Sequence, residues 1–428
     1  MNILTYYSPY FPYTFIPIAL VALYFQIENH LKESWMRWIW WIVIVLVVAV
    51  IGWHAGVDQG WNDFDKGYYH AGRKILRNPS ELYNQDCGYV NFPLMAYVFV
   101  PFGNLPKAVA GTLFFVIGYV SLIPLGYLLV KTPSLNGWER WLALILLWVS
   151  GPLDYSIRLG NITHMIVLII LIALFLYQRG NGWMAGILLG ISGLIKIPLI
   201  APAGYFLIRR KWKIVAGGMM IVTLTVLFSL LIIPLSLNRQ WLDACVLANT
   251  EKPIAGYINQ SAVAMLARET IPRSQVFTWN PQLPPRFQML SWAVTAILLL
   301  PVIIIVIYQW NSIRSNAESI LEFFIVLTSS LLISPISWVH YFAFLIIPTA
   351  YYLGKRFGQN HNKSRDFLMA ISLMLLSVPI EFTGALFRQT NQILFLSLHF
   401  IGGLLFYVVL IWAWIQGEFV KRQKLSTF

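Results

Sequence analysis

Residues 38–65 read WIWWIVIVLVVAVIGWHAGVDQGWNDFD and join an apolar stretch to a polar one. Residues 38–56 contain no Asp, Glu, Lys or Arg and are long enough to cross the roughly 30 Å of hydrocarbon in a bilayer. Similar runs recur along the 428-residue chain, which is 58% hydrophobic and 11% charged. Helices satisfy their own backbone groups in lipid, and these runs lack the period-two alternation of barrel strands. The sequence therefore predicts one all-α, polytopic membrane domain over residues 1–428.

About 11 to 13 transmembrane or re-entrant helices are expected. The predicted spans are roughly 11–26, 37–56, 107–130, 140–153, 161–178, 213–236, 287–310, 319–334, 340–354, 367–383 and 393–416. Residues 93–103 are too short to cross the bilayer, so they are expected to dip into it. Residues 183–208 are interrupted by Lys196 and Pro198, which predicts two half-helices that meet near these residues and leave both flanks on one side. Such breaks are tolerated where they line a cavity.

The formal net charge of +13 reflects basic loops beside the membrane rather than a nucleic-acid partner. With the N-terminus outside, most short basic loops fall inside, as the positive-inside rule requires. The two long polar loops, residues 57–91 and 237–286, then fall outside. We therefore expect a multi-pass protein of the plasma (inner) membrane with its active site on the extracytoplasmic side.

The first long loop contains two carboxylates, Asp63 and Asp65, followed by Tyr68 and Tyr69. A carboxylate beside the bilayer can accept a proton from a substrate hydroxyl. Asp65 is equally suited to cap a helix predicted over residues 66–77. Asp63 has no such local role, which makes it the favoured base, although the spacing does not decide between them. The Asp-x-Asp pattern is a weak metal signal, and no metal ion is expected to be required.

Lys196 is the most informative of the remaining polar residues. A lysine within an apolar run is costly unless it is paired or faces a cavity, so Lys196 is a candidate anion ligand. Other candidates share a predicted position on the outer side: Arg158, His164, Asn259, Gln260, Arg268, Trp338 and His340. Structural alternatives remain open for Arg158, which could extend to the lipid headgroups, and for Trp338, which could belong to the interfacial aromatic belt.

Cys87 and Cys245 are the two cysteines of the chain, and both fall on the outer side in this topology. A disulfide between the two long loops is feasible in an oxidising compartment. Nothing in the sequence fixes the distance between the two residues, so their pairing stays open.

The ordered set of motifs resembles glycosyltransferase family 87, over roughly residues 50 to 345. The matching segments are Asp-Phe followed by Tyr68-Tyr69-x-Ala-Gly-Arg, Phe92-Pro93-Leu94, Gly160-Asn161-Ile162, Lys196-x-Pro198, Asn259-Gln260-Ser261 with Arg268, and Ser334-Pro335-x-Ser-Trp338-x-His340. Two departures stand out. The family usually has its aspartate four residues before the first tyrosine, whereas Asp63 lies five before Tyr68 and Asp65 three. Asn161 replaces the usual glutamine.

This resemblance implies a GT-C fold and a membrane enzyme that uses polyprenyl-phosphate sugars, as the α-mannosyltransferases of the family do. A mannose-like hexose would pass from the lipid phosphate to a hydroxyl of a lipid or glycan acceptor on the outer face. Asp63 or Asp65 would be the base, and no cofactor would be required. Residues expected to bind the donor phosphate or sugar are Arg158, His164, Lys196, Asn259, Gln260, Arg268 and His340. Those expected at the acceptor or the interface are Tyr68, Tyr69 and Trp338.

Two other functions share some of these features. Broken helices with an embedded lysine are also typical of secondary transporters. A protein that binds or polymerises lipid-linked glycans would have the same topology. A transporter, however, is expected to carry more acidic residues in its spans than this chain, which has 17 in total.

Overall fold

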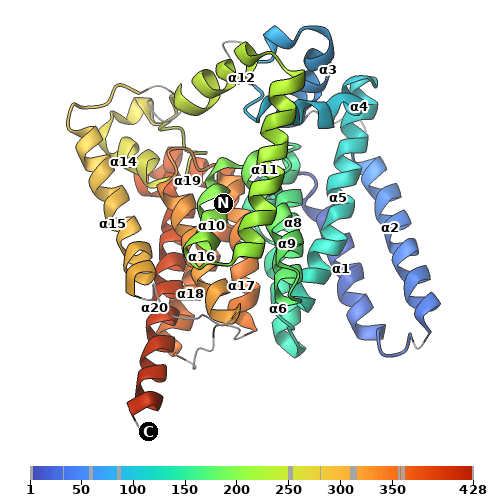
Figure 1. Cartoon of the computed structure of the whole chain (residues 1–428), viewed down its shortest axis with the longest axis vertical. Helices are drawn as coiled ribbons and strands as arrows, with labels where there is room; N and C mark the ends of the chain where they lie inside the picture. The colour runs from blue at the N-terminus through green and yellow to red at the C-terminus, as the bar shows by residue number, and fades with distance from the viewer. Residues whose placement is uncertain are drawn as a thin grey trace.

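The computed structural model describes residues 3–31, 33–56, 61–83, 88–248, 254–279, 281–308, 316–354, 357 and 362–426 (Figure 1). Helices make up 81% of the structure. Within the described residues, β-structure is limited to one isolated antiparallel bridge between Asn259 and Trp338. The predicted all-α class is confirmed.

Five helices of the described chain are long and apolar enough to cross a membrane. They are α2 (Ser34–Gly56), α5 (Lys107–Lys131), α11 (Trp212–Ile232), α15 (Phe287–Tyr308) and α20 (Leu398–Ser426). Shorter helices pack among and against them: α1 (Phe11–Ile27), α6 (Gly137–Trp148), α7 (Gly151–Arg158), α8 (Thr163–Gln178), α16 (Asn316–Ile333) and η8–α17 (Val339–Leu345 and Ile346–Leu353). The arrangement is that of a polytopic membrane protein of GT-C type.

The span predicted over residues 367–383 is instead a bent pair. Helix α18 (Lys363–Ser377) and helix α19 (Ile380–Thr390) meet at 89°. Proline disfavours helical geometry in the residue before it, and Val378 is accordingly extended ahead of Pro379. As a result, α19 turns away from the axis of α18 and carries Glu381 toward the end of α7.

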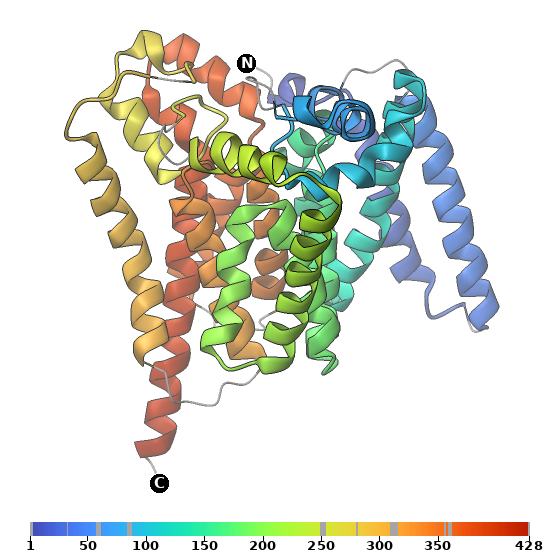
Figure 2. The same cartoon turned by 45° about the horizontal axis from the view of Figure 1, so that its top comes forward.

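Short helices of the two long loops gather at one end of the bundle. Helices α3 (His70–Arg77), α12 (Leu235–Trp241) and α14 (Ala262–Thr270) lie at the end opposite the C-terminus, and the N-terminus lies near them (Figure 2). We call this the loop end. Helix α4 (Val100–Gly103) and the preceding turn η4 (Pro93–Phe99) also lie there, which agrees with a segment too short to cross.

The chain breaks at Lys196, as predicted. Helix α9 (Gly182–Ile195) ends at Lys196, whose backbone is extended, and a short turn leads into α10 (Ile200–Ile208). Helices α9 and α10 contact each other, and both contact α11. The close approach of α9 and α11 depends on glycine, because a Cβ atom at Gly186 would collide with the carbonyl oxygen of Ile214.

A buried ion pair ties α10 to the rest of the bundle. Glu322 on α16 accepts hydrogen bonds from Arg209 Nε at 2.8 Å, from the Tyr205 hydroxyl at 2.5 Å and from Trp414 Nε1 on α20 at 3.2 Å. The side chains of Glu322 and Arg209 are 0% and 3% exposed. A carboxylate at this depth is expensive unless it is paired, so this contact fixes α10 against α16 and α20.

Replacing Glu322 with Gln is expected to destabilise the fold, because Arg209 then keeps a buried charge without its carboxylate. We expect a loss of roughly 3–5 kcal/mol in the free energy of unfolding, measured by denaturant titration in mixed micelles. The matched control is Asp243→Asn, which breaks the exposed pair of Arg239 and Asp243 and is expected to have no measurable effect. Equal stability of both variants would contradict this role of the buried pair.

Candidate active site

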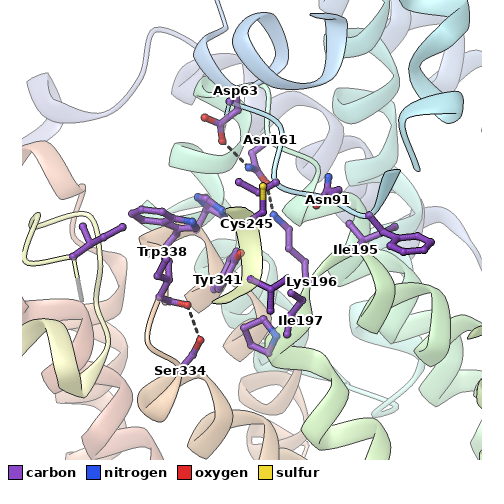
Figure 3. Close-up of a pocket in the computed structure, with 18 of the residues that line it drawn as sticks. Asp63, Asn91, Asn161, Ile195, Lys196, Ile197, Cys245, Ser334, Trp338 and Tyr341 are labelled. Atoms are coloured by element: carbon purple, nitrogen blue, oxygen red, sulfur yellow. Dashed lines mark hydrogen bonds between the residues drawn. The ribbon is translucent and has the colours of Figure 1, made fainter. Parts of the chain in front are cut away.

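A cavity of about 1430 Å³ opens at the loop end and is lined by both long loops and by the break after α9 (Figure 3). Five of the residues singled out from the sequence line it: Asp63, Tyr68, Lys196, Trp338 and His340. Seven others lie outside its lining: Asp65, Tyr69, Arg158, His164, Asn259, Gln260 and Arg268. Residues separated by more than 270 positions in the sequence are thus brought to one cavity.

Asp63 is held in place by its own backbone. Its N–H donates to the carbonyl of Leu159 at 2.9 Å, at the start of a helical segment that continues into the π-helix η2 (Phe64–Tyr69). Gly160 makes this contact possible, since it adopts a φ of +62° and a Cβ atom there would press on Trp61 and Phe64. The anchoring by Leu159 leaves the Asp63 carboxylate on the cavity wall.

Asn161 joins the Asp63 carboxylate to Lys196. Its Oδ1 accepts from the backbone N–H of Thr163 at 3.0 Å and from Lys196 Nζ at 3.3 Å. Because a backbone N–H can only donate, this contact fixes the amide orientation and points Nδ2 at Asp63 Oδ2, 2.6 Å away (Figure 3). Asn161 was not among the candidate ligands, although its place in the Gly-Asn motif was a usable signal.

The Asp63 carboxyl has a raised pKa. Burial in the cavity wall is the largest cause, while the hydrogen bond from Asn161 and the positive charge of Lys196 act in the opposite direction. A carboxylate with a raised pKa is a stronger base than one in water.

Lys196 and His340 line the cavity together with Asp63. The Lys196 side chain is buried and its ammonium lies 4.9 Å from the centre of the Tyr341 ring. His340 is 3% exposed, and neither ring nitrogen has a hydrogen-bond partner within the described chain. A buried imidazole without partners is costly, so His340 is available to a ligand in the cavity.

Asp65 points away from this site. Its carboxylate contacts Lys107 Nζ at 2.5 Å and lies 3.8 Å from His70 Nε2. The expectation that Asp65 caps a helix starting at Lys66 is wrong, because the chain is already helical from residue 62 onward. The two aspartates therefore occupy different environments, and only Asp63 faces the cavity.

Arg158, His164 and Tyr69 lie behind the wall of the cavity. Arg158 pairs with Glu381 of α19 and stands 5.0 Å from the ring of Tyr155. His164 Nδ1 lies 3.0 Å from the hydroxyl of Ser156. The Tyr69 hydroxyl donates to the carbonyl of Leu105 at 3.0 Å. Their contacts stabilise the wall.

The motif of the second loop, Asn259-Gln260-Ser261 with Arg268, makes hydrogen bonds to backbone groups. Asn259 Oδ1 accepts from the N–H of Ser337 at 2.8 Å, and the N–H of Gln260 donates to the carbonyl of Ser337 at 2.7 Å. The guanidinium of Arg268 is fully buried and donates to three carbonyls of the same loop, at 2.9, 3.1 and 3.4 Å. These contacts place the second loop against the segment that precedes His340, rather than presenting Asn259, Gln260 or Arg268 to a ligand.

Two further expectations concern metals and cysteines. Over the ranges that the structure describes, no group of three or more His, Cys, Asp and Glu side chains is arranged to hold a metal ion. Cys245 is buried and lines the cavity, with Sγ 3.7 Å from the carbonyl of Tyr89. Cys87 lies outside the described residues, so its pairing with Cys245 stays open, and catalysis without a metal stays a prediction.

The all-helical bundle with several apolar spans is that of a polytopic membrane protein of GT-C type, and its cavity at the loop end brings a carboxylate, an ammonium and an imidazole together. The sequence profile of glycosyltransferase family 87 matches residues 89–335, more than half of the chain. The chain belongs to this family and is a multi-pass membrane glycosyltransferase. The matched region starts after Asp63, so the first-loop aspartates lie outside it.

Curated relatives agree with this family. A polyprenol-phosphate-mannose-dependent α-(1-2)-phosphatidylinositol pentamannoside mannosyltransferase of Mycolicibacterium smegmatis is 25% identical over 322 residues, which cover 71% of this chain and 73% of that protein. Its counterpart from Mycobacterium tuberculosis is 25% identical over 71% of this chain and 70% of its own. A polyprenol-phosphate-mannose-dependent α-(1-2)-phosphatidylinositol mannoside mannosyltransferase of M. tuberculosis is 22% identical over 68% and 67%.

Replacing Arg268 with Lys tests whether Arg268 acts on the loop or on a substrate. Lysine keeps the charge, but its single nitrogen cannot bind the loop carbonyls and also replace the contacts of Arg268 Nε and Nη2 with Ser397 Oγ at 3.2 and 3.0 Å. We therefore expect faster hydrogen exchange in residues 254–261 and 335–338 together with reduced activity. If Arg268 bound the donor phosphate instead, the variant would raise the KM for donor with unchanged exchange in both segments.

Proposed function

We propose that this glycosyltransferase transfers mannose from a polyprenyl-phosphate donor to a hydroxyl of a mannosylated lipid acceptor, with Asp63 as the general base. The observation that carries the proposal is the network of Asp63, Asn161 and Lys196 in the cavity at the loop end. The names of the curated relatives support mannose as the sugar and a phosphatidylinositol mannoside as the class of acceptor.

The reaction needs one proton transfer and one displacement. The acceptor oxygen attacks C1 of the donor sugar while its proton passes to the Asp63 carboxylate. The bond between C1 and the phosphate oxygen breaks, and the lipid leaves as a phosphate monoester. A single displacement of this kind inverts the configuration at C1. The raised pKa of Asp63 favours this role, because the carboxylate accepts a proton more readily.

The departing phosphate gains negative charge, which Lys196 and His340 are placed to stabilise. Both side chains are buried, so their interaction with an anion is only weakly screened by water. Both ring nitrogens of His340 lack a partner within the described chain, so the one that carries the N–H can donate to a phosphate oxygen. A lysine and an imidazole suffice for a monophosphate leaving group, and the proposed reaction uses no metal ion.

The isoprenoid tail has an apolar surface beside the phosphate position. Ile195, Ile197 and Pro198, at the break between α9 and α10, line the cavity next to Lys196. Ile197 is 43% exposed and Ile200, one turn further on, is 56% exposed. Exposed apolar side chains continuous with a cavity suit a lipid chain that enters from the bilayer.

The positive-inside rule supports an extracytoplasmic active site in the plasma (inner) membrane. The connections on the far side of the bundle from the cavity include the basic residues Lys131, Arg179 and Arg209 to Lys213, which flank α5, α8, α10 and α11. The loop end, with the cavity, would then face outward.

Asp63→Asn is expected to reduce kcat about 10²- to 10⁴-fold, because the amide cannot accept the acceptor proton. The matched variant Asp65→Asn, which alters the carboxylate that contacts Lys107, is expected to keep most of the activity. The measurement is transfer of labelled mannose from a polyprenyl-phosphate donor in proteoliposomes. Loss of activity in Asp65→Asn with full activity in Asp63→Asn would reverse the assignment of the base.

Asn161→Ala is expected to shift the pH profile of kcat/KM. Asp63 is active when deprotonated, so activity rises with pH through its pKa. The Asn161 amide hydrogen bond lowers this pKa, and its removal raises the pKa and moves the acidic limb to higher pH. Asn62→Ala, another change in the cavity lining, is the control and should leave the limb in place. An unshifted limb in Asn161→Ala would argue against Asp63 as the titrating base.

A further inference from the structure

Two tryptophans meet at the wall of the cavity. The rings of Trp279 and Trp338 have centroids 5.6 Å apart and planes at 57°, and both residues line the cavity. Trp279 is 54% exposed. In Figure 3, Trp338 lies on one side of Lys196 and Asn161 and Ile195 lies on the other, with Ile197 below Lys196. The tryptophan pair and Ile195 therefore lie on different sides of Lys196.

Backbone hydrogen bonds fix Trp338, and the packing of a neighbouring phenylalanine fixes the segment that carries Trp279. Trp338 forms the isolated bridge with Asn259, and the next N–H, of Val339, donates to the carbonyl of Ile258 at 3.0 Å. Trp279 follows Phe277, whose ring packs edge-on against Tyr257 and Phe387 at 5.4 and 5.5 Å.

The second loop supplies a core for this anchoring. Val276 is fully buried in a small hydrophobic cluster that is separate from the main core of the bundle. The other buried members of the cluster are Ala255, Ala267, Ile271, Phe287, Phe387 and Leu396. Trp279 lies three residues after Val276, at the exposed end of this packed segment. The packing of the segment therefore holds the indole of Trp279 at the cavity.

We infer that Trp279 and Trp338 form an aromatic platform that binds a pyranose ring of the acceptor glycan. Two indoles at 57° make a corner that contacts a sugar on a face and an edge. The face of an aromatic ring is electron-rich and attracts the C–H groups that cover one side of a pyranose. Tryptophans of the interfacial belt face lipid headgroups, whereas these two face the cavity that holds Asp63.

The arrangement favours the acceptor over the donor sugar. In the proposed function, the donor phosphate binds at Lys196 and the donor tail along Ile195 and Ile197, which precede and follow Lys196 in the cavity lining. The platform lies on the side of Lys196 away from Ile195, and its outer member, Trp279, is open to solvent. This inference rests on the proposed function, because it assigns the second substrate of the same site.

Trp279→Ala is expected to raise the KM for a phosphatidylinositol mannoside acceptor about tenfold, with donor KM and kcat unchanged. Trp279→Phe keeps an aromatic face and should restore most of the loss. Trp292→Ala is the matched control, since Trp292 on α15 is 69% exposed but does not line the cavity. A rise in donor KM, an equal effect of Trp292→Ala, or no effect of Trp279→Ala would each overturn the platform.

A binding measurement tests the aromatic platform independently of mannose transfer. Saturation-transfer NMR with methyl α-mannopyranoside and the full chain in nanodiscs should give signals on one face of the sugar. The signals should persist in Asp63→Asn and disappear in Trp279→Ala. If the wild type transfers no mannose but these signals depend on Trp279, the proposed function fails and the platform stands. If transfer occurs and the signals are the same in Trp279→Ala, the platform alone is wrong.

Discussion

The energetic cost of an ammonium group inside a membrane protein constrains the rest of this structure. Lys196 lies in an apolar run, where a charge is tolerated only with partners or a polar cavity. The chain provides both. It ends α9 at Lys196, leaves a cavity beside it and places the Asn161 amide oxygen 3.3 Å from Nζ. Asn161 then carries the influence of this charge to Asp63, so the lysine and the carboxylate belong to one network.

A charge at a helix break needs rigid support, because the half-helices on either side have few residues of their own. Helix α10 has only nine residues and is secured at its far end by the pair of Arg209 and Glu322. Helix α9 is secured along its length by α11, through the close approach at Gly186. The buried Lys196 is thus held in place, through α10, by the ion pair of Arg209 and Glu322 at the far end of that helix.

Local pattern was enough to predict the fold class and the break at Lys196, because apolar length and a charge beside proline act within one segment. It was not enough for contacts made across the chain. Asp65 and Lys107 are 42 positions apart and Arg158 and Glu381 are 223 apart, so neither partner could be inferred from spacing. The sequence favoured Asp63 as the base without deciding between the two aspartates, and the structure places only Asp63 in the cavity lining.

The second-loop motif shows why matching residues are not always ligands. Asn259 and Arg268 fit a family pattern and were expected to bind the donor, yet their polar atoms hold backbone groups. Substituting a buried guanidinium that donates to three carbonyls leaves these carbonyls without their donor, which is costly even where the residue touches no ligand. Arg268 fixes the loop that binds Ser337, and Trp338 and His340 follow Ser337 in the chain, so a change at Arg268 is expected to displace both residues. The second loop contacts both parts of the site. Its residues 254–261 bind the segment that leads to Trp338 and His340, and its Gln240, Trp241 and Cys245 donate to backbone carbonyls of the first loop. A substitution in the second loop can therefore act on either part of the site.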